Sequence, residues 1–493
     1  MVNGRVAMKP TSLYKGQFDL RSAFPIFGFS ILYQMKEIVK KALTLLFFLS
    51  TTIAVFAQQK PVYTFWQDDS LLKKNYYEQA LATQKTLLNS LGKENKDDYK
   101  SIYEDRFEEV ARLLKSNRTV TAPEAHEYLQ TVLKKIVDAN PELKPLQVRM
   151  VFSRDWWPNA YSMGEGTLIV NAGLMVFLDN EAEMVFVLCH ELAHFYLDHS
   201  NKSIKKRVET VNSEEFKKEI KRLSKEEYKF NQQFNDLLKK LTFSSRQHSR
   251  ESESEADRQA FLFMKRTGYD CKGIKTCLQM LDKVDDSLLF KPLVLEQTFN
   301  FPDYPFKKKW IQKESVLFGA MKEDDSPLTK KEKDSLKTHP DCIKRIEALE
   351  DSIQKTGAGR EFLVNEQLFN KLKKEFLVEM TEQEFRDKDL GRNLYYNLVM
   401  LQQGQNMPLA IYSIARDLNI AYESQKNHSL GTWYSAESRW LPADYSLLLR
   451  MLSRLRLEEI AALNYHFCKQ YKDQMLGYAG FEEEMDKAIK RAD

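Results

Sequence analysis

Two histidines four residues apart, His190 and His194, stand in an otherwise apolar stretch of the sequence. If this stretch is helical, the spacing places both rings on one face, about one turn apart. Two imidazoles placed in this way can bind one Zn²⁺, and Glu191 between them can reach a water molecule on the metal. The pattern arises by chance in roughly one chain of this size in a hundred. The alternative is a pair of solvated or hydrogen-bonded histidines, which would be costly in an apolar run.

A catalytic zinc site needs a third protein ligand, because three protein groups and one water fill its four positions. The acidic stretch at 251–257 is the best source, since Glu253 and Asp257 are four residues apart and share a helix face. We expect Glu253 to bind the metal and Asp257 to accept the ring N–H of a ligand histidine. Alternatively, these acids only suit the start of a charged helix. His199 would lie on the opposite face of a continuous helix from His190, as a structural histidine.

The elements that position these residues follow from local patterns. Asn180 with Glu183 three residues later is a capping box that starts the metal-binding helix. Apolar residues at helical spacing predict another helix from Pro123 to about Ala139. Three short strand-like segments lie between the two helices, and we expect them to form a small sheet against the metal-binding helix. The segments are residues 146–152, 159–163 and 167–171.

The composition favours a mainly helical, α+β globular protein. The chain has 493 residues, enough for two or three domains, and only 17 glycines and 14 prolines. Its charges are well mixed, with a net charge of +4 and no basic stripe with interleaved aromatics, which argues against nucleic acid as a partner. The five cysteines are odd in number. Cys271 and Cys277 could form a local bridge, although buried free thiols are an equally good interpretation.

The N-terminal residues have the pattern of a targeting segment. Three lysines precede an apolar run over 42–56, and Ala57 provides a small residue at a cleavage point. The run is shorter than the ~20 residues that a membrane-spanning helix needs. We therefore predict a signal peptide over 35–57, with an uncleaved anchor as the alternative, and an exported protein. Residues 1–34 precede this signal, and we interpret them as a spurious upstream extension, with translation beginning at Met35.

The remaining sequence predicts three regions. A polar, helical segment over 58–119 comes first, and a metal-binding domain follows over 120–350. That domain contains a stretch dense in lysine and glutamate, about 201–245, which we interpret as a helical insertion. Its basic run is either a solvated helix face or a site of peripheral membrane association. Residues 360–493 predict a helical C-terminal domain.

Four motifs carry a resemblance to a known family. In chain order they are Asn159-Ala160-Tyr161 with Gly166, His190 to His194, Ser249-Arg250 with Glu253 and Ala256-Asp257, and Thr338-His339-Pro340 with Arg345-Ile346. Together they resemble the HtpX/BepA-type zinc metallopeptidases, which are gluzincins related to the CAAX prenyl endopeptidases. The resemblance implies a metallopeptidase domain with an HExxH helix, a small β-sheet and a glutamate helix. It also implies that Glu253, three residues before Ala256, is the third ligand rather than Glu251 or Glu255.

The resemblance also implies a chemistry, which is hydrolysis of peptide bonds by a zinc-activated water with Glu191 as general base. The developing oxyanion needs one further donor, and Arg250, His339 and Tyr161 are the candidates. His339 could instead occupy the open metal position and hold the enzyme latent. Asn159 is a candidate for substrate binding by strand addition, although a turn-capping role explains it equally well.

These observations predict an exported zinc metalloendopeptidase of the periplasm or cell envelope. It would act on protein or peptide substrates in envelope protein quality control. The alternative is a chaperone-like or scaffold protein whose C-terminal helices bind partners and whose metal is structural or latent. Glu191 separates the two, because hydrolysis requires this carboxylate and a structural metal site does not. The sequence leaves the oligomeric state open.

Overall fold

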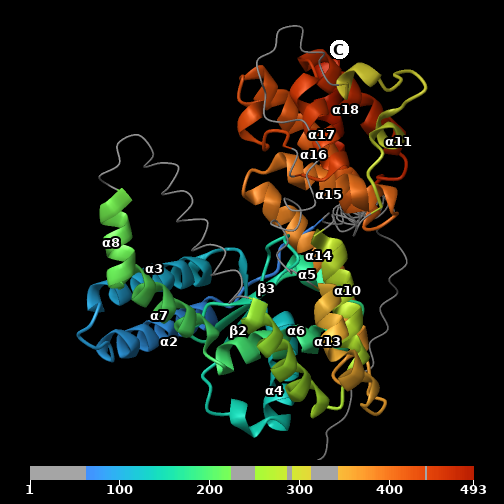
Figure 1. Ribbon diagram of the computed structural model, residues 1–493. Helices are drawn as coiled ribbons and strands as arrows, with labels where there is room; N and C mark the ends of the chain where they lie inside the picture. The colour runs from blue at the N-terminus through green and yellow to red at the C-terminus, as the bar shows by residue number, and fades with distance from the viewer. Residues whose placement is uncertain (1–62, 224–249, 286–290, 313–341, 439–440, 493) are drawn as a thin grey trace, which may run out of the picture. The chain divides into compact units, whose positions relative to one another are not determined.

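The computed structural model describes residues 63–223, 250–285, 291–312, 342–438 and 441–492 (Figure 1). The predicted signal peptide, the extension before it, His339 and the second half of the predicted insertion lie outside these residues. The contacts described below lie within residues 61–476 and 480–493, which form one unit. The prediction of a mainly helical α+β protein with a small sheet is confirmed.

The sheet has four strands in the order β1-β2-β4-β3. They are β1 (Thr119–Val120), β2 (Arg149–Ser153), β3 (Ala160–Ser162) and β4 (Thr167–Asn171). The two central strands, β2 and β4, are parallel and buried along their whole length, whereas β1 and β3 pair antiparallel at the edges. The three strands expected from the sequence are present. The fourth, β1, was missed because two residues carry no alternation that a pattern could reveal.

Helices α4 (Pro123–Ala139), α5 (Ala172–Phe177) and α6 (Glu181–Tyr196) pack against this sheet, α10 (Lys272–Asp285) packs against α6, and α13 (Cys342–Gln354) packs against α10. A further helix runs over residues 250–265, and we call it the glutamate helix. Helix α4 has the bounds that its apolar period and its proline at the first helical turn predict. Gly268, with φ +85°, follows the glutamate helix in the left-handed conformation that its place after a helix end predicts.

Helix α6 begins as its sequence predicts. The side chain of Asn180 accepts a hydrogen bond from the backbone N–H of Glu183 at 3.0 Å. The Glu183 carboxylate accepts in return from the backbone N–H of Asp179 at 2.8 Å, one residue before the cap. Most of the helix is buried, which is why its sequence is apolar almost all round rather than on one stripe.

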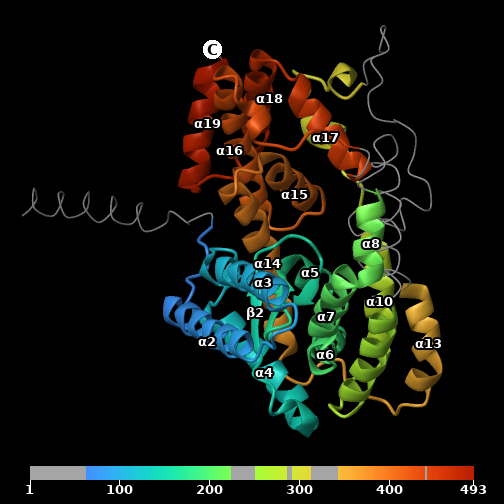
Figure 2. The same cartoon turned by 60° about the vertical axis from the view of Figure 1, so that its left-hand side comes forward.

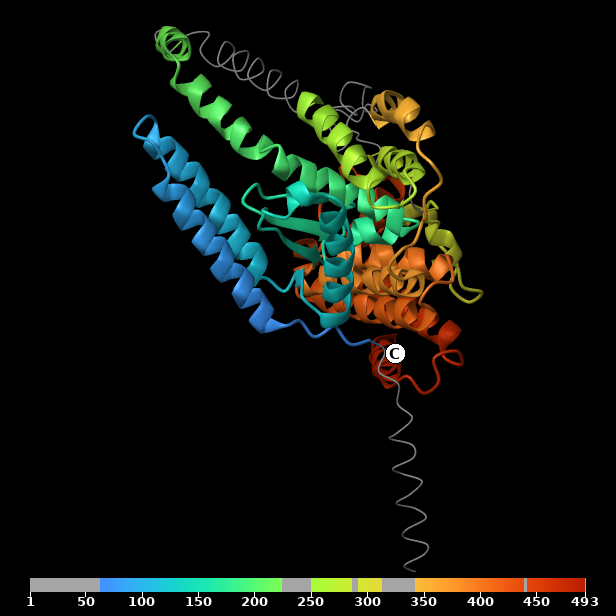
Figure 3. The same cartoon turned by 90° about the horizontal axis from the view of Figure 1, so that it is seen from below.

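A pair of long helices precedes β1, and a second pair follows α6. The first pair is α2 (Ser70–Asn89) and α3 (Lys96–Lys115), and the second is α7 (His199–Asn212) and α8 (Glu214–Leu223). The two blue helices of Figure 3 show α2 lying along α3. Helix α7 contacts α3, since Asn212 donates to Asp98 at 2.6 Å and Arg106 donates to Asn201 at 3.0 Å. The described half of the predicted insertion is therefore helical.

The C-terminal helices begin with α14, which contacts the sheet region as well. They are α14 (Glu366–Arg386), α15 (Leu390–Gln402), α16 (Met407–Lys426), α17 (Ala443–Arg454), α18 (Leu457–Tyr471) and α19 (Ala479–Ala492). Phe376 on α14 packs against Phe152 of β2 with 4.7 Å between ring centroids, and Glu382 on α14 binds Arg416 of α16 at 2.7 Å. Helix α16 lies against α15 and α18 (Figure 2). The predicted boundary near residue 355 stays a prediction, because α14 contacts elements on both sides of it.

Between α10 and α13 the chain leaves the sheet region. Helix α11 (Leu295–Phe299) and a 3-10 turn at Lys308–Trp310 lie in the described part of this stretch. The backbone N–H of Leu293 donates to Asp444 at 2.8 Å, and Lys469 binds Asp303 at 3.1 Å, so these residues contact the C-terminal helices.

The described residues settle the expectation on the cysteines. All five cysteines are buried and none is in a disulfide, so the local bridge between Cys271 and Cys277 is not formed. In the part of the chain that the structure describes, no helix has the length and apolar character needed to cross a membrane.

The first residue of α6, Glu181, joins several elements through one buried carboxylate. It accepts hydrogen bonds from the hydroxyls of Tyr128 and Tyr269, each at 2.9 Å. The three backbone N–H groups at 363–365, just before α14, donate to the same carboxylate at 2.8–2.9 Å. Burial alone would raise the pKa of Glu181, but these donors hold it below its ordinary value of 4.5. The start of the metal-binding helix is thus tied to α4, to the loop before α10 and to α14.

We expect Glu181→Gln to destabilise the fold by roughly 3 kcal/mol or more. An amide has a single acceptor oxygen, so several of the five donors lose their partner, and a hydrogen bond to a charged group contributes about 1.5–3 kcal/mol. Urea unfolding of the two proteins measures the difference. Glu127→Gln, at an exposed position of α4, is the matched control and should change stability by less than about 0.5 kcal/mol. Equal stability of all three proteins would contradict the role of Glu181.

Candidate metal centre

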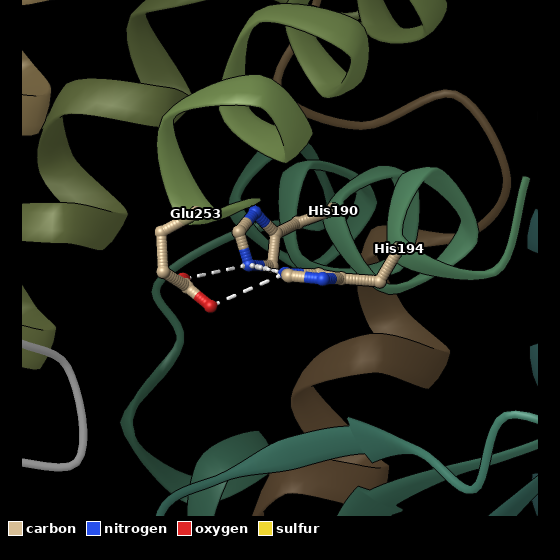
Figure 4. Close-up of side chains that lie close together, drawn as sticks. All are labelled: His190, His194 and Glu253. Atoms are coloured by element: carbon tan, nitrogen blue, oxygen red, sulfur yellow. Dashed lines mark hydrogen bonds and ion pairs between the residues drawn. The ribbon is translucent and has the colours of Figure 1, made fainter. Parts of the chain in front are cut away.

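The three predicted ligands meet at one point, with two side chains from α6 and one from the glutamate helix (Figure 4). The Nε2 atoms of His190 and His194 are 3.0 Å apart, and each lies 3.3 Å from a carboxylate oxygen of Glu253. One ligand atom from each residue lies within 4.8 Å of the others. Tetrahedral ligands about 2.0–2.1 Å from Zn²⁺ are themselves about 3.3 Å apart, so the donor atoms have the spacing of a zinc site.

Packing of the glutamate helix on α6 brings Glu253 to the histidines. Ala256 and Ala260 are fully buried, so the small side chains allow a close approach of the two helices. Tyr196 at the end of α6 packs edge-on against Phe263, with ring centroids 5.6 Å apart. The amide of Asn140, after α4, donates to the backbone carbonyl of Phe263 at 3.1 Å. These contacts hold in place a helix about sixty residues distant in sequence.

Asp257 lies where the sequence predicts it. Its Oδ1 is 3.0 Å from Nδ1 of His190, the ring nitrogen that faces away from the other ligands. Arg345 on α13 donates two hydrogen bonds to Asp257, at 2.6 and 2.7 Å, and lies 3.6 Å from Glu253. Burial would raise the pKa of Asp257, but Arg345 lowers it to about 2. The sequence analysis includes Arg345 in the fourth motif but assigns it no partner, because one arginine on an amphipathic helix carries no signal of the residue that it binds.

His199 is the residue whose predicted position is wrong. Helix α6 ends at Tyr196, and Asp198 has φ +56°, which turns the chain so that α7 begins at His199. The ring therefore does not lie on the opposite face of a continuous helix. Its Nδ1 is 2.9 Å from Nδ1 of His194, and its Nε2 is 3.0 Å from Glu255. The Glu255 side chain that binds His199 is 51% exposed.

The ligand cluster attracts positive charge. Burial alone would lower the pKa of His190, but Asp257 and Glu253 raise it to about 10. Burial lowers the pKa of His194. Against the effect of burial, hydrogen bonds from the two histidines hold the pKa of Glu253 well below its ordinary value. Without a metal, a proton is drawn to the point where the three ligands converge, and a divalent cation would compete for the same place.

Glu191 stands beside the ligands on the side that faces the sheet. Its side chain is partly exposed. Burial has the largest effect on the pKa of Glu191 and raises it to about 7, although the neighbouring His190 acts in the opposite direction. The backbone N–H of Ser162 in the edge strand β3 donates to its carboxylate. A carboxylate with a pKa near neutrality, held next to a metal site, suits the exchange of a proton with water.

Arg250 and Tyr161 are the described candidates for the donor to the oxyanion. Arg250 is exposed and lines a small groove of about 170 Å³ together with Glu253 and Arg345. The phenol of Tyr161 interacts with Asp155, which lies outside the ligand cluster, and burial raises its pKa to about 12. The structure therefore places Arg250 at a groove between the glutamate helix and α13 that also contains the ligand Glu253, and it gives no support to Tyr161 as the oxyanion donor.

Asn159 extends the ladder of β3 by one residue, because its backbone carbonyl accepts from the N–H of Asn171 at 3.0 Å. No contact of Asn159 with the ligand cluster is present among the described residues. Its role in substrate binding stays a prediction, and so does the role of His339, which lies outside the described residues.

Comparison with known proteins agrees with this geometry. The model of Peptidase family M48 matches residues 123–353. The matched region begins at α4, ends within α13, and includes the sheet, the three ligands, Glu191, Asp257 and Arg345. No curated protein matches the chain. The match supports a metallopeptidase over this region, whose substrates are proteins or peptides.

Proposed function

We propose that the chain is a zinc-dependent endopeptidase exported to the cell envelope. The match of residues 123–353 to Peptidase family M48 supports the peptidase part of this proposal. The observation that carries the proposal is the convergence of His190, His194 and Glu253, with Glu191 beside them. Two imidazoles and one carboxylate form the ligand set of a catalytic rather than a structural zinc site, because three protein ligands leave one position open.

The residues present fit the metal. His190 and His194 would bind it through Nε2, and Glu253 would bind it through its carboxylate. The other ring nitrogen of His190, Nδ1, lies beside Asp257, which sets the orientation of that ring. When bound, Zn²⁺ supplies Lewis acidity, which lowers the pKa of a water molecule and polarises the scissile carbonyl group.

The chain's own residues perform the proton transfers. Glu191 takes a proton from the attacking water and later delivers it to the leaving amine. The Ser162 N–H orients the Glu191 carboxylate. Strand β3 is an edge strand, so an extended substrate can add to it and present a peptide bond beside Glu191. Arg250, at the groove next to Glu253, is the described candidate for contact with the developing oxyanion.

The cellular role rests on the sequence. The lysines, apolar run and small residue before position 58 support export, and the resemblance to HtpX/BepA-type peptidases supports a role in envelope protein quality control. Edman sequencing of the protein recovered from the periplasm or envelope tests the export step. Cleavage after Ala57 agrees with it, whereas recovery from the cytoplasm with an intact N-terminus contradicts it.

Metal content and chelator sensitivity test the activity. We expect about one Zn²⁺ per purified chain and cleavage of casein that 1,10-phenanthroline abolishes and added Zn²⁺ restores. Elemental analysis and gel-based proteolysis measure the two properties. Zinc binding without cleavage, together with suppression of the aggregation of an unfolded client protein, would favour the chaperone-like alternative. Cleavage that is unaffected by chelation would exclude the zinc mechanism.

A further inference from the structure

A second ionisable pair stands behind the ligand histidines, and the proposed function leaves it without a role. His199 is buried, and within the described residues both of its ring nitrogens face side chains rather than backbone. One nitrogen faces His194 at 2.9 Å and the other faces Glu255 at 3.0 Å. We propose that His199 and Glu255 are positioning residues that hold His194 in its metal-binding orientation and so increase the affinity for Zn²⁺. This inference rests on the proposed metal site.

The positions of the protons follow from the contacts. A neutral histidine that binds a metal through Nε2 carries its proton on Nδ1. The Nδ1–H of His194 then donates to Nδ1 of His199, which must be unprotonated there and protonated on Nε2. That Nε2–H donates to the Glu255 carboxylate. One set of tautomers satisfies all three groups, and it is the set in which Nε2 of His194 is free to bind a metal.

The same arrangement exists at the other ligand. Nδ1 of His190 faces Asp257, which Arg345 holds with two hydrogen bonds. Each ligand histidine therefore has an ionisable partner behind it. The partner of His194 differs in kind, because a neutral imidazole stands between the ligand and the carboxylate. The His199 ring separates the Glu255 carboxylate from His194. We therefore expect the charge of Glu255 to affect the affinity for the metal less than the charge of Asp257 does.

The backbone explains how His199 reaches this place. The left-handed conformation of Asp198 breaks the helix after α6 and directs the first residue of α7 back towards His194. The glutamate helix supplies the other partner. Glu253 and Glu255 are two residues apart and point to different sides of that helix, so Glu253 reaches His194 directly and Glu255 reaches it through His199.

Metal affinity of the full chain is the test. His199→Phe keeps a ring in the space but removes the acceptor for His194, and we expect Zn²⁺ binding to weaken about 10–100-fold. His199→Asn places an amide oxygen near the position of Nδ1 and should stay within a few fold of the parent. Glu255→Gln, at a half-exposed position that tolerates substitution, should weaken binding by less than His199→Phe. Competition with a chromophoric chelator measures the three constants.

Matched controls separate positioning from folding. His126→Phe changes a histidine of α4 that contacts Tyr76, and Glu209→Gln changes an exposed glutamate of α7. Both should bind Zn²⁺ as the parent does. The thermal unfolding of metal-free His199→Phe should match that of the metal-free parent, and the visible spectrum of its Co²⁺ form should differ.

Three results would contradict the inference, and they are distinguishable. If the parent binds Zn²⁺ and His199→Phe and Glu255→Gln bind it equally well, the pair has no positioning role, although the proposed function stands. If the parent itself binds no Zn²⁺, the proposed function and this inference fail together. If His199→Asn loses as much Zn²⁺ affinity as His199→Phe, the acceptor at the position of Nδ1 has no role.

Discussion

We expect the replacement of Glu191 by glutamine to lower the rate of casein hydrolysis by about 10²–10⁴-fold while the chain keeps its zinc. Glutamine has nearly the shape of glutamate and can still accept from the Ser162 N–H, so the local structure should persist. It cannot take a proton from water at neutral pH, which removes the step that general base catalysis contributes. The loss should therefore appear in kcat with little change in KM.

The zinc content of the variant is the internal control. Glu191 is not among the three converging ligands, so elemental analysis should find the parent's content in Glu191→Gln. Glu127→Gln on α4 should hydrolyse casein at the parent's rate. A Glu191→Gln protein that binds zinc and cleaves casein as fast as the parent would falsify the peptidase mechanism and leave a structural metal site as the explanation.

Replacing Glu253 by glutamine should weaken Zn²⁺ binding by more than about 100-fold, beyond the 10–100-fold cost of losing a partner that only supports a ligand. The amide carries no charge to neutralise the cation and binds zinc poorly. Hydrolysis should fall with the bound metal and recover in part when Zn²⁺ is raised. Chelator competition measures the affinity, and casein cleavage at several Zn²⁺ concentrations measures the recovery.

Glu251→Gln is the matched control for this variant, because it makes the same change on the exposed side of the same helix. It should leave the affinity unchanged. If Glu253→Gln binds Zn²⁺ as tightly as the parent, the third ligand lies elsewhere. The neighbouring carboxylates of Glu255 and Asp257 would then be the next positions to replace.

Local sequence patterns were sufficient for much of the fold. The period of apolar residues and Pro123 set both ends of α4, and Asn180 with Glu183 set the start of α6. These features depend on residues within one or two turns of each other, so a short stretch of sequence is enough to predict them. The break between α17 and α18 was less accessible. The chain becomes extended at Leu455, where neither glycine nor proline marks the end of a helix.

The division is the same at the site. The sequence by itself determined that His190 and His194 lie one turn apart on a helix, with Glu191 between them, because i and i+4 positions meet on any α-helix. It also supplied Glu253 and Asp257 as a pair on one face. Only the tertiary structure decided that this face meets the histidines, since that depends on packing between helices some sixty residues apart. The turn at Asp198 that brings His199 behind His194, and the docking of α13 that brings Arg345 to Asp257, were decided in the same way. Each requires contacts between distant segments, and no local spacing encodes such contacts.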